Sequence, residues 1–117
     1  GIISVTMGGK EGVSQIQGIM EKLRANPPKE INGVKAVTLK DFELQAETDI
    51  ATGAKTEIKL PKSNVIQVIL EDGTYITARP SGTEPKIKYY FGVNAKTESL
   101  VEEKMESMKK AFTEIVK

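Results

Sequence analysis

The sequence is most informative about its fold at residues 65–79, which read Val65-Ile66-Gln67-Val68-Ile69-Leu70-Glu71-Asp72-Gly73-Thr74-Tyr75-Ile76-Thr77-Ala78-Arg79. An Asp-Gly pair lies between two segments rich in β-branched residues, and this pattern is a strong signal for a β-hairpin. A two-residue turn at Asp72 and Gly73 predicts two antiparallel strands, with Arg79 leaving the sheet at the open end of the hairpin. The expected cross-strand pairs are Leu70 with Tyr75, Val68 with Thr77, and Ile66 with Arg79.

Two further elements are expected after this hairpin. Residues 87–93 alternate between apolar and polar side chains and predict a strand, with Lys88 and Tyr90 on one face. A possible capping box at Ser99-Leu100-Val101-Glu102 begins a C-terminal helix. The strand's other face carries Ile87, Tyr89, Phe91 and Val93, and the helix carries an apolar stripe of Val101, Met105, Met108, Phe112 and Ile115.

Before the hairpin, an amphipathic helix is expected from Lys10 to Asn26, where Pro27 and Pro28 end it. After a turn at Ile31-Asn32-Gly33, residues 34–44 predict a strand with a bulge near Lys40-Asp41. Residues 47–62 are interpreted as a polar connection or an irregular hairpin. The helix stripe consists of Val13, Ile16, Ile19, Met20 and Leu23.

This order of elements predicts a single α+β domain over residues 1–117, with a largely antiparallel sheet and helices packed on one face. The 17 basic and 16 acidic residues give a net charge of +1, which favours neither a nucleic-acid nor a membrane partner. The sequence has no cysteine and no histidine, so it lacks thiol nucleophiles and the commonest zinc ligands. We expect a cytoplasmic protein, because a chain without cysteine suits a reducing compartment, and we expect it to be soluble, because no apolar stretch is long enough to span a membrane.

The residues with the clearest chemical potential follow the hairpin, in Arg79-Pro80-Ser81-Gly82-Thr83-Glu84-Pro85. A guanidinium, two hydroxyls and a glycine between two prolines make a stiff segment rich in hydrogen-bond donors, as a phosphate requires. Lys88, in the following strand, can add a second positive charge. From the residues alone, an ordinary surface loop with Arg79 paired to Glu84 remains an equal alternative.

The longer run Arg79-Pro80-Ser81-Gly82-Thr83-Glu84-Pro85-Lys86-Ile87-Lys88-Tyr89-Tyr90-Phe91 resembles the phosphate-binding loop of the fourth domain in the α-D-phosphohexomutase superfamily. The resemblance is to bacterial phosphoglucomutases and phosphomannomutases, and it extends over essentially the whole chain. It implies a TATA-binding-protein-like fold and a substrate phosphate held by Arg79, Ser81, Gly82 and Thr83. Lys88 stands where many relatives carry an arginine.

The resemblance also implies a four-domain enzyme that interconverts hexose 1-phosphates and hexose 6-phosphates through a hexose 1,6-bisphosphate, with a phosphoserine and Mg²⁺. The family's serine loop, Asp-x-Asp-x-Asp metal loop and sugar-recognition loop are all absent from this sequence. We therefore expect a C-terminal fragment that is inactive alone, contains no catalytic residue, metal site or cofactor of its own, and has the phosphosugar and the other domains as partners. Glucose is the favoured hexose, ahead of mannose and glucosamine.

Two other functions are compatible with the residues. A stand-alone anion- or nucleic-acid-binding module is suggested by the basic and aromatic run at 86–91, but the alternation leaves only Lys88 and Tyr90 on one face. An interaction domain that uses the methionines of the C-terminal helix is less favoured than core packing of that stripe.

Overall fold

The computed structural model describes residues 2–81, 86–94 and 96–116, which form two helices and eight strands. Helix α1 spans Val13–Ala25 and helix α2 spans Glu98–Val116. The strands are β1 (Ile2–Glu11), β2 (Glu30–Ile31), β3 (Val34–Asp41), β4 (Ala46–Asp49), β5 (Lys55–Glu57), β6 (Ile66–Leu70), β7 (Tyr75–Pro80) and β8 (Lys86–Asn94).

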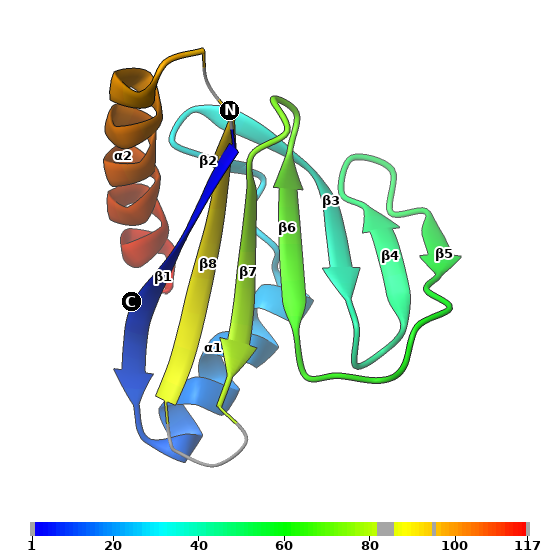
Figure 1. Cartoon of the computed structure of the whole chain (residues 1–117). Coiled ribbons are helices and arrows are strands. Elements are labelled where there is room, and N and C mark those ends of the chain that lie inside the picture. Colours follow the sequence, from blue (N-terminus) through cyan, green and yellow to red (C-terminus); the bar gives the residue numbers. More distant parts are fainter. Residues whose placement is uncertain (1, 82–85, 95, 117) are drawn as a thin grey trace.

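Seven of these strands form one sheet in the order β1-β8-β7-β6-β3-β4-β5, and β2 pairs with β3 (Figure 1). Every pairing is antiparallel. The C-terminal strand β8 lies between β1 and β7, so the sheet brings together segments from both ends of the chain. This arrangement confirms the predicted α+β fold with an antiparallel sheet.

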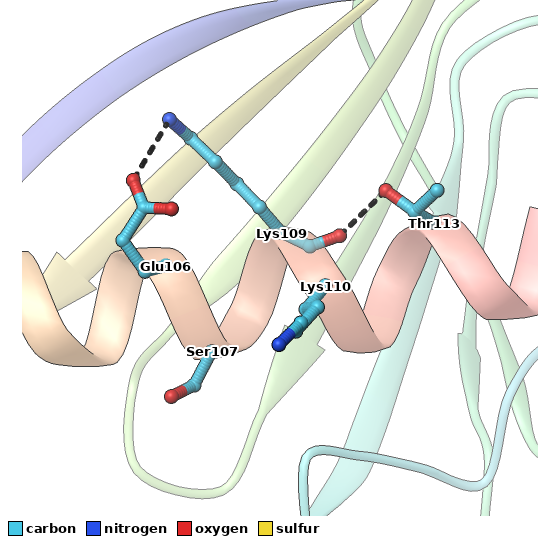
Figure 2. Close-up of a pocket in the computed structure, with 5 residues that line it drawn as sticks. All are labelled: Glu106, Ser107, Lys109, Lys110 and Thr113. Atoms are coloured by element: carbon cyan, nitrogen blue, oxygen red, sulfur yellow. Dashed lines mark hydrogen bonds and ion pairs between the residues drawn. The ribbon is translucent and has the colours of Figure 1, made fainter.

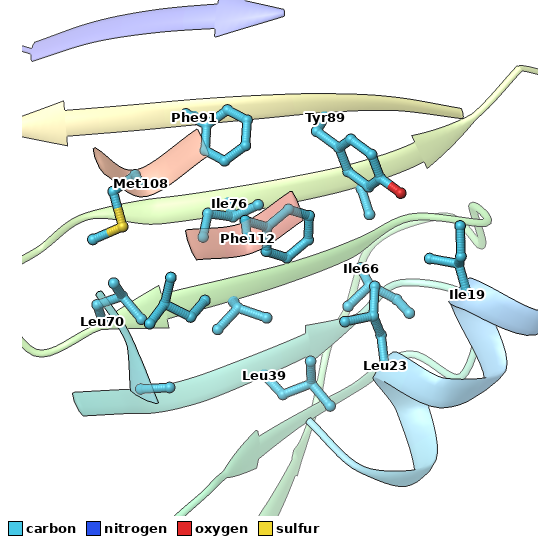
Figure 3. Packing of buried hydrophobic residues seen from close by; sticks show 14 of the residues in the cluster. Ile19, Leu23, Leu39, Ile66, Leu70, Ile76, Tyr89, Phe91, Met108 and Phe112 are labelled. Atoms are coloured by element: carbon cyan, nitrogen blue, oxygen red, sulfur yellow. The ribbon is translucent and has the colours of Figure 1, made fainter. Parts of the chain in front are cut away.

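The hydrophobic core lies between the sheet and both helices (Figure 3). Alternate residues of β6, β7 and β8 are buried on the same face of the sheet, as the predicted period of two requires. The described stripe residues of both helices also pack into this core, while the prediction for Val13 lies outside the described side chains. Buried helix residues are Ile16, Ile19, Met20, Leu23, Val101, Met105, Met108 and Phe112, and Ile115 is partly buried.

The N-terminal prediction was wrong at its start. Residues 10 and 11 belong to strand β1, and α1 begins only at Val13. Pairing of β1 with β8 continues to Glu11 opposite Lys86, and Gly12 then adopts a positive φ of 99° that turns the chain into the helix. The alternating apolar residues of 3, 5 and 7 would have indicated this strand.

The central hairpin has a three-residue turn in place of the predicted two-residue turn. Gly73 N–H donates to the Leu70 carbonyl at 3.0 Å, and Gly73 alone has a positive φ, 90°, among the residues of this turn. A type I turn followed by a left-handed glycine contains one residue more than the predicted turn. The pairing of β6 with β7 is therefore shifted by one residue from the predicted pairing. The observed pairs are Ile66 with Ala78, Gln67 with Thr77, Val68 with Ile76, and Ile69 with Tyr75.

Two element boundaries and the position of one bulge also differ from expectation. Strand β3 ends at Asp41 and not at residue 44, and its irregularity lies between Ala36 and Thr38 rather than near residues 40–41. Helix α2 is capped by Thr97, whose Oγ1 accepts a hydrogen bond from Leu100 N–H at 3.2 Å, rather than by the predicted Ser99. Of the two interpretations of residues 47–62, the irregular hairpin is observed, since β4 pairs with β5.

Candidate anion-binding site

Arg79 and Lys88 lie directly opposite each other on neighbouring strands β7 and β8. Both side chains are exposed, and each lies between residues that face the core: Ala78 precedes Arg79, and Ile87 and Tyr89 flank Lys88. The two cations therefore lie on the face of the sheet that carries no helix. The corrected register is essential here, because the predicted pairing of Arg79 with the buried Ile66 would have placed Arg79 on the core face.

The electrostatics of this pair are unfavourable without an anion. Like charges placed directly opposite each other in a sheet are destabilising. Within the described residues, neither Arg79 nor Lys88 forms an ion pair with a carboxylate. The alternative pairing of Arg79 with Glu84 lies outside the described residues. A bound anion would offset the repulsion, and a guanidinium beside an ammonium suits phosphate oxygens.

Ser81 lies directly after β7 and before β8 in the sequence. Its backbone N–H donates to the carbonyl oxygen of Lys86 at 2.8 Å, so β7 and β8 remain in register up to the loop. Ser81 thus comes two residues after Arg79, directly beyond the end of β7. Gly82 and Thr83, the other two predicted ligands, lie outside the described residues and stay predictions.

The same face extends along β6, β7 and β8 as a polar surface. Thr77 lies opposite Tyr90 in the next outward-facing row, and its Oγ1 accepts a hydrogen bond from Gln67 Nε2 at 3.1 Å. Further along, Tyr75 lies opposite Gly92, and its ring occupies the space above the glycine. The alternation of the sequence indicated Lys88 and Tyr90 as neighbours on one face, whereas Thr77 became part of this surface only with the corrected register.

Helix α1 begins at the same edge of the sheet as the cation pair. Its first residue follows β1, whose last residue, Glu11, pairs with the first residue of β8, Lys86 (Figure 1). Among the described residues, no side-chain hydrogen bond caps this helix start, and the first turn of α1 contains no acidic residue. The positive end of the helix dipole therefore lies at this end of the sheet, on the core side, with Glu11 two residues before it in the sequence.

A shallow hollow on the outward side of α2 is not a competing site. Its volume is about 390 Å³, and its lining comes from a single helix (Figure 2). Lys109 forms an ion pair with Glu106 at 3.7 Å, so one of the cations that line the hollow is neutralised. The lining residues are Glu106, Ser107, Lys109, Lys110 and Thr113, and none of the predicted ligands is among them.

The part of the chain that the structure describes contains no cluster of metal ligands and no helix that could span a membrane. Residues 2–81, 86–94 and 96–116 contain no group of three or more Asp or Glu residues placed to hold a metal ion. The implied Mg²⁺ thus finds no fitting set of ligands among them. Neither of the described helices has the length and apolar character needed to cross a bilayer.

The fold and the cation pair define a class: an α+β domain that presents a basic sheet edge, with Ser81 directly after strand β7. Residues 4–111 match the family model described as "Phosphoglucomutase/phosphomannomutase, C-terminal domain". The match covers most of the chain, and the chain belongs to this family. The predicted resemblance is therefore confirmed.

Individual relatives give the same result. The chain is 39% identical over 107 residues to a phosphoglucomutase of Staphylococcus aureus (strain bovine RF122 / ET3-1), which covers 92% of the chain and 19% of the relative. It is 40% identical over 93 residues to a phosphoglucomutase of Staphylococcus epidermidis (strain ATCC 12228 / FDA PCI 1200), covering 80% of the chain and 17% of that relative. The chain thus spans about a fifth of the length of the curated relatives it matches.

Proposed function

We propose that residues 1–117 form the C-terminal, substrate-phosphate-binding domain of a longer phosphohexomutase that interconverts hexose 1-phosphates and hexose 6-phosphates. The observation that carries this proposal is the exposed cross-strand pair of Arg79 and Lys88. The family membership and the names of the relatives support the same reading. Ser81, Gly82 and Thr83 complete the proposed set of phosphate ligands.

The role we assign to the domain is to hold the phosphate that does not react. Arg79 offers a planar pair of N–H donors to two phosphate oxygens, and Lys88 adds a point charge on the opposite strand. A phosphate fixed at this edge orients the sugar relative to groups elsewhere in the polypeptide, and such positioning lowers the entropic part of the barrier. In this proposal, Mg²⁺ and the hexose 1,6-bisphosphate act together with residues of the longer polypeptide outside these 117.

The isolated chain should bind weakly. Hydrogen bonds to a charged group contribute about 1.5 to 3 kcal/mol each, whereas association costs about 4 kcal/mol or more. A site with a few such bonds and no enclosing walls is expected to have a Kd of about a millimolar. Tight binding requires the rest of the polypeptide to enclose the sugar.

Kinetics of the longer polypeptide test this function. With glucose 1-phosphate as substrate, Arg79→Ala should lower kcat/KM by about 10- to 100-fold, because one charge-assisted contact to the phosphate is lost. Lys88→Ala should have a smaller effect of the same kind. Lys55→Ala removes an exposed cation from β5, at the far side of the sheet, and should leave kcat/KM unchanged.

Two results would contradict the proposal. One is an Arg79→Ala enzyme with the kinetics of the Lys55→Ala control. The other is measurable glucose 1-phosphate conversion by the 117-residue chain alone, supplied with Mg²⁺ and glucose 1,6-bisphosphate, because this chain contains no serine or metal loop of the family.

A further inference from the structure

The uncovered face of the sheet changes its chemistry with distance from the cation pair of Arg79 and Lys88. Strands β6, β7 and β8 lie side by side in the sheet (Figure 1), and the next outward-facing row takes one residue from each of them. We call this the hydroxyl row, and its residues are Gln67, Thr77 and Tyr90. In the row after that, Ile69 lies opposite Tyr75, so the face becomes more apolar there.

The side chains of the hydroxyl row have hydrogen-bonding capacity to spare. Gln67 Nε2 donates to Thr77 Oγ1 at 3.1 Å, so the Thr77 hydroxyl accepts in this bond and keeps its own proton to donate. Within residues 2–81, 86–94 and 96–116, this is the one side-chain hydrogen bond that the three residues make. All three side chains are partly exposed, so a ligand on this face can reach them.

The hydroxyl row lies about one sugar ring away from the cation pair. Thr77 and Arg79 are two residues apart on β7, and Tyr90 and Lys88 are two residues apart on β8. Two residues of an antiparallel strand separate the rows by about 7 Å. A pyranose ring joined to its phosphate by one ester oxygen spans a comparable distance. A phosphate between the two cations can therefore place its sugar over Thr77 and Tyr90.

The charges at the other end of the hydroxyl row favour this orientation of the ligand. Lys40 of β3 lies opposite Gln67, and its Nζ is paired with Glu47 Oε1 at 3.7 Å. The carboxylate offsets the charge of this lysine, so a phosphate is attracted more strongly to the cation pair. The uncharged hydroxyl row is left for the rest of the ligand.

We propose that Thr77 and Tyr90 bind the pyranose ring of the phosphosugar whose phosphate is held by Arg79 and Lys88. This inference rests on the proposed function and extends it from the phosphate to the sugar. The Thr77 hydroxyl donates to a sugar hydroxyl, and the apolar face of the Tyr90 ring packs against C–H groups of the pyranose. A few placed polar groups beside an aromatic surface fix the orientation of a ligand, so the sugar is kept from rotating about its phosphate.

Titrations of the 117-residue chain with two phosphate monoesters test this proposal. Glucose 1-phosphate and methyl phosphate both carry a phosphate monoester, but only glucose 1-phosphate carries a sugar ring. Both should shift the backbone amides of Arg79 and Lys88, whereas only glucose 1-phosphate should shift the Thr77 methyl group and the Tyr90 ring resonances. Glucose 1-phosphate should also bind about 3- to 10-fold more tightly, as expected for one additional neutral hydrogen bond.

Substitutions in the hydroxyl row separate sugar binding from phosphate binding. Thr77→Val and Tyr90→Ala should each weaken the binding of glucose 1-phosphate by about 3- to 10-fold and leave the binding of methyl phosphate unchanged. Thr38→Val is the matched control, because Thr38 is a partly exposed threonine on the same face of the sheet, opposite Ile69 on β3. This control should bind both esters as the unmodified chain does. Tyr90→Leu repeats the test if Tyr90→Ala lowers the melting temperature.

Three outcomes overturn the proposed sugar contact. Equal affinities for the two esters, with no shift at Thr77 or Tyr90, would leave the phosphate site intact and remove the sugar contact. An equal loss of methyl phosphate binding in Thr77→Val and in both Tyr90 variants would assign these residues to the phosphate instead. If neither ester shifts Arg79 and Lys88, the proposed function fails and the sugar contact fails with it.

Discussion

Among single residues, Tyr89 combines two properties that conflict energetically. Its ring packs edge-on against Phe112, with ring centroids 5.0 Å apart, inside the core (Figure 3). Its hydroxyl is buried and finds no hydrogen-bond partner among the described residues. Burial raises the pKa of the Tyr89 hydroxyl from 10.0 to about 12. The alternation of β8 predicted that this side chain faces the core, but not that its polar atom stays unsatisfied there.

Tyr89→Phe should not weaken the fold at neutral pH. Removing an unsatisfied buried hydroxyl is expected to leave the free energy of unfolding unchanged or to raise it by about 1 kcal/mol. Denaturation of both proteins in urea measures the difference. A decrease of more than about 1 kcal/mol in the phenylalanine variant would show that the hydroxyl makes a stabilising hydrogen bond.

The unmodified chain and the Tyr89→Phe variant should also differ in how the free energy of unfolding changes with pH. The folded pKa of Tyr89, about 12, lies above the unfolded value near 10, so the unfolded chain releases this proton first as the pH rises. Stability linked to the protonated hydroxyl is therefore fully present below about pH 10 and is lost as the pH rises toward the folded pKa. The tyrosine protein should lose this stability in alkali, and the phenylalanine variant should not.

At the scale of elements, the central hairpin shows how one turn determines a site. The sequence predicted both strands and their antiparallel pairing correctly, because β-branched residues and an Asp-Gly signal are local features. It could not distinguish a two-residue from a three-residue turn, since both place a glycine in the left-handed region. That single residue decides whether Arg79 faces the core or the uncovered face.

Strand β8 contains a second element-scale feature, the pairing of Gly92 with Tyr75. A Cβ added to Gly92 would lie 2.1 Å from Cε1 of Tyr75, so the ring would have to move. Gly92→Ala should lower the free energy of unfolding by about 1 to 3 kcal/mol, the usual cost of overpacking. Thermal or urea denaturation measures the loss.

The control for this substitution is Gly18→Ala on helix α1, where no atom lies within 4 Å of the added Cβ. It should stabilise the chain by up to about 1 kcal/mol, because glycine is unfavourable inside a helix. In the Tyr75→Ala background the cost of Gly92→Ala should nearly vanish. Equal costs with and without the tyrosine ring would rule out the proposed contact.

For the whole molecule, sequence patterns predicted the fold class, most elements and the candidate phosphate ligands, but not the pairing of Arg79 with Lys88 across β7 and β8. The periods of two and 3.6 residues identified the core faces of β8, α1 and α2, since burial imposes those periods. Strand β1 was missed although its alternation is visible, and its pairing with β8 is a contact between distant parts of the chain. The alignment of Arg79 with the end of β3 depends on the order of strands β3, β6 and β7, which no local pattern encodes.

The central claim is that phosphate binds at the edge formed by Arg79 and Lys88. A chemical-shift titration of the 117-residue chain with glucose 1-phosphate tests it most directly. At millimolar ligand the backbone amides of Arg79, Ser81, Gly82, Thr83 and Lys88 should shift, and these shifts should disappear in Arg79→Ala but persist in Lys35→Ala, which removes an exposed cation from β3. Shifts that cluster on other strands or helices, or that survive in Arg79→Ala, would contradict the claim.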